Sequence, residues 1–138
     1  MSFHEKSAWA MGALMLVTGL WYLFLVLGIP VDAPAPAQLG AAIPWVLAVI
    51  VGSIAIQILL AAFNLRDAQK PADERERLVI DRAGHWSGYV LAAGVVTGAI
   101  HYLGYGEGNR LLQFVIGSMI AAQLAEYAFQ VVLFRRGV

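Results

Sequence analysis

The chain has 138 residues with nine acidic and nine basic side chains, so its formal net charge is zero. This length fits a single domain, and a neutral chain has no strong field to attract nucleic acid. Hydrophobic residues make up 60% and charged residues 13% of the sequence, whereas soluble proteins carry about 25% charged residues. The composition predicts a lipid-embedded protein. Because there is no cysteine, disulfide exchange and thiolate metal sites are excluded.

Four long stretches carry almost no charge, and each can hold one membrane crossing of about 20 apolar residues. Helices are predicted at about residues 7–27, 45–63, 73–103 and 111–134. The third begins within a charged loop at about 64–84 and crosses the membrane at about 85–103. Pro34, Pro36 and Pro44 precede the second helix and predict a loop there. The expected fold is all-α, a polytopic membrane protein with four transmembrane helices in one domain, residues 1–138.

Basic residues are distributed unevenly between the two sides of this arrangement. Of the nine lysines and arginines, only Arg110 falls on the side opposite the termini. Because lysine and arginine near helix ends stay in the cytoplasm, both termini are expected there.

The two halves of the chain resemble each other. Residues 17–19 in the first helix and 96–98 in the third both read Val-Thr-Gly, and residues 52–53 and 117–118 both read Gly-Ser. This internal repeat predicts two tandem helical hairpins related by an axis along the membrane normal.

Most of the charge lies between residues 64 and 85. Asp73, Arg77, Asp81 and His85 follow at intervals of four, which places them on one helix face as alternating ion pairs. The face is either a solvated, self-paired surface or a docking surface for a partner or a phospholipid head group.

Two segments resemble a known group of proteins. Residues 73–80 read Asp-Glu-Arg-Glu-Arg-Leu-Val-Ile, and residues 134–137 read Phe-Arg-Arg-Gly. These motifs resemble those of small bacterial inner-membrane proteins of unknown function, in which an Asp-Glu-Arg segment precedes the third of four helices. Phe134 stands where that group usually has tyrosine. The resemblance covers the last half of the chain and implies the same topology, but no activity.

Glu126 is the most informative polar residue. It lies about eight residues before the end of its helix, or ~10–12 Å deep at 1.5 Å per residue. A carboxylate there should be paired, protonated or facing protein or water. Gln123 and Gln130 share its face, and Ser53 and Gln57 form a similar stripe on the second helix. We expect Glu126 to bond Gln57, either as neutral glue between helices or as a proton- or cation-binding site.

The histidines provide fewer candidates. Thr97 and His101 share a face near the outer end of the third helix. His4 and His85 lie at the inner boundary and are the only pair that could hold a metal or haem. We expect no metal there, and no cofactor.

Small residues at fourfold spacing permit close helix contacts. Three such rows occur, at residues 84, 88 and 92, at 94 and 98, and at 117, 121 and 125. Four helices need only some of these rows internally, so a homo-oligomer would use the others.

Three functions follow as hypotheses. The first is a non-enzymatic membrane protein that assembles with itself or another membrane protein through its helices and charged loop. The second is a small proton- or cation-coupled transporter that uses Glu126. The third is a membrane enzyme, although no nucleophile elbow, phosphate loop or zinc motif is present in the sequence.

Overall fold

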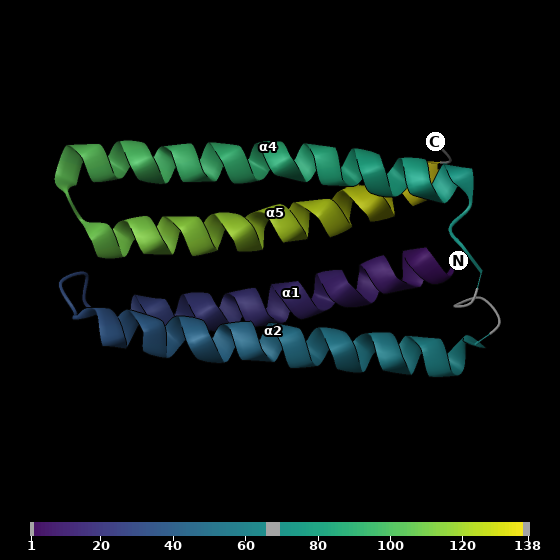
Figure 1. Cartoon of the computed structure of the whole chain (residues 1–138), viewed down its shortest axis with the longest axis horizontal. Coiled ribbons are helices and arrows are strands. Elements are labelled where there is room, and N and C mark those ends of the chain that lie inside the picture. Colours follow the sequence, from purple (N-terminus) through teal and green to yellow (C-terminus); the bar gives the residue numbers. More distant parts are fainter. Residues whose placement is uncertain (1, 66–69, 137–138) are drawn as a thin grey trace.

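The computed structural model describes residues 2–65 and 70–136, which form four antiparallel helices. They are α1 (Phe3–Leu27), α2 (Ala35–Phe63), α4 (Glu74–Tyr105) and α5 (Gly108–Arg136). Both ends of the chain lie at the same end of the molecule (Figure 1). We call this the terminal end, and the opposite end, where both hairpins turn, the hairpin end.

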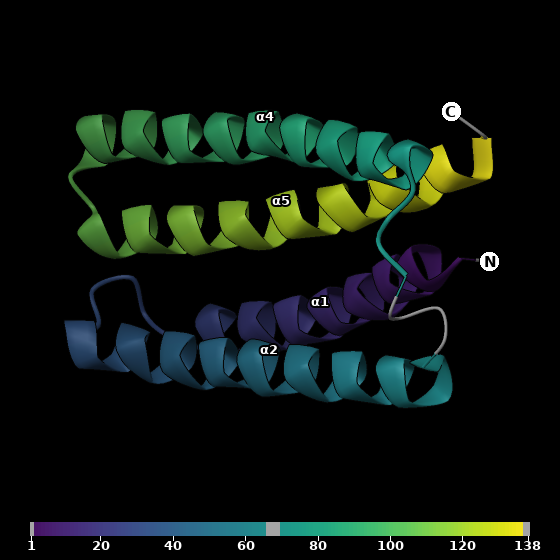
Figure 2. The same cartoon turned by 45° about the vertical axis from the view of Figure 1, so that its right-hand side comes forward.

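The helices lie in the order α4, α5, α1, α2. Helix α5 packs most extensively on α4 and also on α1, which in turn packs on α2. Helices α4 and α2 lie at opposite edges in both views (Figures 1 and 2). The hairpins α1–α2 and α4–α5 therefore meet through α1 and α5, and each edge helix has one well-packed neighbour.

Local signals in the sequence fix the helix ends. The hydroxyl of Ser2 accepts a hydrogen bond from the backbone of Glu5 at 3.2 Å and caps α1. Asp73 caps α4 in a reciprocal capping box with Glu76. Gly106 ends α4 with φ = 71°, a left-handed conformation that glycine adopts without steric strain.

The prediction of a loop before residue 45 is wrong, because α2 begins at Ala35. Pro36 occupies the first turn, where a missing N–H is tolerated. Pro44 lies inside the helix, where it removes one backbone hydrogen bond. The buried residues of α2 all lie in this first part, at Gln38, Ala41, Ala42 and Trp45. Packing against neighbouring helices thus outweighs the local effect of proline.

Three of the four helices, α1, α2 and α5, are long and apolar enough to cross a membrane. Helix α4 is the longest, at 32 residues, but is not among them. Its first turns carry charges, and its later turns contain His85, Trp86, Tyr89 and His101, whose polar atoms lower the mean hydropathy.

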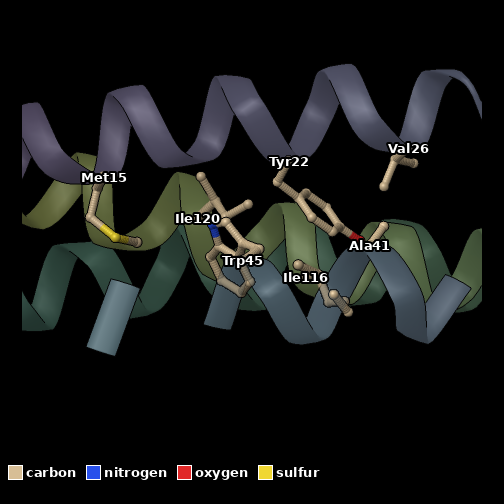
Figure 3. Close-up of a cluster of buried hydrophobic side chains, with 8 residues drawn as sticks. Met15, Tyr22, Val26, Ala41, Trp45, Ile116 and Ile120 are labelled. Atoms are coloured by element: carbon tan, nitrogen blue, oxygen red, sulfur yellow. The ribbon is translucent and has the colours of Figure 1, made fainter. Parts of the chain in front are cut away.

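A cluster of buried hydrophobic side chains joins α1, α2 and α5 in the half of the molecule near the hairpin end (Figure 3). The Tyr22 and Trp45 rings lie 5.4 Å apart within it. The buried members of this cluster are Met15, Tyr22, Val26, Ala41, Ala42, Trp45, Ile116 and Ile120. This cluster joins the two hairpins, whereas the α4–α5 contact holds the second hairpin together.

Candidate functional site

Glu126 is half-buried on α5 and accepts two hydrogen bonds from its own helix. The Gln123 amide donates to Oε2 and the Gln130 amide to Oε1, each at 3.2 Å. Gln130 is itself buried, at 8% exposure. The predicted polar stripe therefore brings these three side chains together, and both carboxylate oxygens have a donor.

The polar side chains of α2 do not join this group. The exposed Gln57 donates to the hydroxyl of Ser7 on α1 at 2.9 Å, and Ser53 donates to the carbonyl of Ile50 on its own helix. The expected bond between Glu126 and Gln57 is therefore replaced by one between Gln57 and α1. The reason is topological, since α2 packs mainly on α1, and α1 lies between α2 and the helix α5 that carries Glu126 (Figure 1).

Polar contacts at the terminal end connect α1 to every other helix. His4 lies 3.8 Å from Glu76 of α4, and Lys6 donates to Asn64 after α2 at 2.9 Å. Glu5 lies 4.0 Å from Arg135 of α5. A polar cavity of about 480 Å³ opens here, between the start of α1, the residues that precede α4 and the last turn of α5. These contacts position the N-terminus of α1 against the charged residues at the start of α4.

The row Asp73, Arg77, Asp81 and His85 is exposed along α4, as its spacing predicts. These side chains do not form the alternating ion pairs expected from the sequence. Arg77 donates to the carbonyl of Ala72 at 3.1 Å, and His85 contacts the hydroxyl of Tyr89 at 3.1 Å. Asp73 is engaged in the helix cap. The side chains of Asp81 and Arg77 are therefore both exposed on the surface of α4.

Thr97 and His101 point to different environments. Thr97 is exposed and donates to the carbonyl of Ala93 at 2.7 Å. The His101 ring packs against Tyr105 and against Phe114 of α5. Its Nδ1 is buried and has no hydrogen-bond partner in the described chain. His101 thus acts as a packing residue between α4 and α5.

The two remaining histidines contact different residues. His4 faces Glu76, whereas His85 pairs with Tyr89 more than two turns further along α4. Among residues 2–65 and 70–136, no three His, Cys, Asp or Glu side chains are grouped to hold a metal ion.

A polar network at the hairpin end was not anticipated from the sequence. The Asn109 amide donates to the carbonyls of Val31 at 2.8 Å and Ala33 at 2.7 Å. Gln113 donates to Gln38 at 3.2 Å. The network joins α5 to the turn between α1 and α2 and to Gln38 in the first turn of α2. Its only sequence signal is an amide residue near a helix end, which is common in loops.

The glycines of α4 fall into two groups. A methyl group added to Gly94 or Gly98 would lie 2.7 Å from Cβ of Ser118 or 2.6 Å from Cβ of Phe114, so both glycines are needed for close packing on α5. Gly84 and Gly88 have no atom of another described segment within 4 Å of such a group. Two of the predicted small-residue positions are therefore used inside the chain, and two are left open.

The equivalent glycines of the proposed repeat have unequal partners. Gly98 of α4 packs on Phe114 within its own hairpin, whereas Gly19 of α1 packs on Ile120 of the other hairpin. A methyl group added to Gly52 would meet Leu14, whereas no atom of another described segment lies within 4 Å of one added to Gly117. No family model, curated protein or solved structure matches this sequence.

Proposed function

We propose that this protein is a non-enzymatic module of a bacterial inner membrane that crosses the bilayer four times and pairs with a second copy through α4. Both termini then lie in the cytoplasm, where the charged start of α4 is available to a partner. The apolar character of α1, α2 and α5 supports the membrane placement. Helix α4 runs beside α5 along its length (Figure 1), which supports a fourth crossing.

The observation that carries the pairing is the open glycine row of α4. A glycine inside a helix is about 1 kcal/mol less favourable than alanine. Gly94 and Gly98 offset this cost by close contact with α5, but Gly84 and Gly88 have no such contact within the described chain. Small residues one turn apart allow the backbones of two membrane helices to approach closely. A second copy supplies the missing neighbour.

The position of α4 in the molecule favours the same conclusion. It lies at an edge, and among the described helices α5 is its only extensive neighbour (Figure 2). Tyr89 follows Gly88 in the sequence and is 64% exposed. Its aromatic side chain would bury a large area against a second helix.

The tandem hairpins support an origin by duplication as part of this proposal. The matched Thr18 and Thr97 both donate to the carbonyl four residues earlier in their helices. The hairpins α1–α2 and α4–α5 also have the same order and direction along the molecule. Divergence after duplication accounts for the unequal glycine partners.

Topology is tested with cysteines, because the chain contains none. Asp32→Cys at the hairpin end and Ser2→Cys and Arg136→Cys at the terminal end would be exposed separately to a membrane-impermeant maleimide in spheroplasts. We expect labelling of Asp32→Cys in intact spheroplasts, and of the other two only after permeabilisation. Three crossings would place Ser2 and Arg136 on opposite sides, so labelling of just one of these two without permeabilisation refutes the fourth crossing.

Pairing is tested by energy transfer between donor- and acceptor-labelled copies in liposomes. Gly88→Leu should raise the dissociation constant of the pair about tenfold, or about 1.4 kcal/mol. The matched control is Gly104→Leu, since Gly104 is also a contact-free glycine of α4 but lies outside the row. Equal energy transfer for the two variants, or no transfer in the wild type at any protein-to-lipid ratio, contradicts the proposal.

Glu126 supports a second candidate function, proton- or cation-coupled transport. Its two amide donors would hold a carboxylate ready to bind a cation inside the membrane. If this is its role, reconstituted wild-type protein should conduct protons or cations, and Glu126→Gln should abolish the flux without unfolding the protein. Absence of flux in the wild type leaves Glu126 with a structural role, as the first candidate requires.

A further inference from the structure

A groove runs between α1 and α5 on one side of the molecule. Near the terminal end it forms an apolar cavity of about 390 Å³. Its lining includes the small residues Gly12 and Ala13 of α1 and Ala128 of α5, together with Leu16 and Val132. A second cavity of about 360 Å³ continues toward the hairpin end and shares Leu16 with the first.

The lining of the first cavity includes an aromatic ring, and a cation lies beside that ring. Trp9 lines the cavity and is 46% exposed. The guanidinium carbon of Arg135 lies 5.3 Å from the Trp9 ring centroid, and the Arg135 side chain is 65% exposed. Arg136 follows and is also exposed. The Glu5 carboxylate lies 4.0 Å from Arg135, at the limit of an ion pair.

We propose that this groove binds an anionic phospholipid, with the acyl chain over Gly12 and Ala128 and the phosphate at Arg135. The arginine fork suits phosphate oxygens, and tryptophan favours the level of the head groups. This inference rests on the proposed membrane placement but not on pairing through α4.

A second copy is a poorer occupant of the same groove. A twofold axis along the membrane normal brings each residue opposite its own equivalent at the same depth. Arg135 and Arg136 of the two copies would then face each other, and like charges repel. An anionic lipid complements these charges, and its flexible chain can follow an uneven groove.

The test is native mass spectrometry of the detergent-purified full chain with dioleoyl phosphatidylglycerol or dioleoyl phosphatidylcholine. We expect the wild type to retain phosphatidylglycerol in preference to phosphatidylcholine. Arg135→Gln should weaken phosphatidylglycerol retention about fivefold, the ratio expected for one arginine near an anionic surface. Ala128→Leu, which fills the groove, should weaken retention of both lipids.

Two control variants match these changes outside the groove. Arg110→Gln removes an exposed arginine at the hairpin end that pairs with Glu107 at 2.8 Å, and Ala62→Leu adds the same bulk to an exposed position of α2. Neither should change lipid retention. If Arg110→Gln and Arg135→Gln have equal effects, or if the two lipids are retained equally, the site is not selective and the inference is wrong.

The same spectra report the mass of the protein assembly. If Ala128→Leu lowers the proportion of dimer and leaves lipid retention unchanged, a second copy occupies the groove and the lipid proposal is overturned. A wild type that is monomeric but retains phosphatidylglycerol would contradict pairing and support the lipid site. Circular dichroism checks that each variant is folded, and Arg135→Gln, a surface change, keeps the test decisive if Ala128→Leu unfolds.

Discussion

Replacement of Gly94 by alanine should loosen the contact between α4 and α5, which is the most extensive helix contact of the fold. The new methyl carbon would lie 2.7 Å from Cβ of Ser118 and 3.4 Å from its backbone Cα. No rotation of Ser118 moves these atoms away, because both are fixed by the α5 backbone. The helices must therefore separate locally.

The magnitude follows from overpacking, which costs about 1–3 kcal/mol when a methyl group is forced into a packed site. The gain in helix propensity on replacing glycine by alanine, about 1 kcal/mol, acts in the opposite direction. The control Gly104→Ala brings at most that gain, because nothing lies near its added methyl group. We expect Gly94→Ala to be less stable than Gly104→Ala by about 1–3 kcal/mol.

Reversible unfolding in mixed micelles, followed by circular dichroism, measures this difference. Ser118→Gly removes the Cβ that clashes, so the double variant Gly94→Ala with Ser118→Gly should recover part of the loss. A coupling free energy between the two sites of about 1 kcal/mol or more is expected for residues in contact. Equal stability of Gly94→Ala and Gly104→Ala, or strict additivity in the double variant, would refute the reasoning.

Three further predictions concern the helix ends. Asp73→Ala removes the capping box of α4 and should lower the free energy of unfolding by about 1 kcal/mol; an unchanged value would mean that the α4 terminus frays in the native protein. Asn109→Ala deletes both hydrogen bonds to the other hairpin and should cost about 1–3 kcal/mol; thermal unfolding compared with Asn64→Ala, whose side chain bonds Leu60 and Lys6 within the first hairpin, distinguishes the link between hairpins from a general loss of hydrogen bonds. Gly106→Ala forces a side chain into φ = 71° and should cost about 1 kcal/mol; chemical denaturation that shows no loss would indicate a different α4–α5 turn.

The three helices that the structure identifies as apolar enough to span a membrane were predictable from charge-free stretches alone. The start of α4 was also predictable, because Asp73 acts locally and the capping box needs only residues within one turn. The start of α2 was not. Local proline signals favoured a loop, whereas burial of Gln38 and Trp45 against other helices favours the helix.

The polar stripe of α5 was visible in the sequence because Gln123, Glu126 and Gln130 share a face at helical spacing. The neighbours of that stripe were not. A sequence pattern shows which residues share a helix face, but it does not specify which helix lies opposite. Gln57 therefore met Ser7 of α1 instead of Glu126.

The sequence by itself determined the helical class, the number of apolar segments and the residues that share each helix face, since these depend on composition and on the 3.6-residue period of the helix. Only the tertiary structure decided the order α4, α5, α1, α2, and with it which small residues are covered. Gly94 and Gly88 look alike in the sequence, yet one is packed against Ser118 and the other is open. The difference arises because side-chain contacts between helices depend on their relative rotation and distance, which no local pattern specifies.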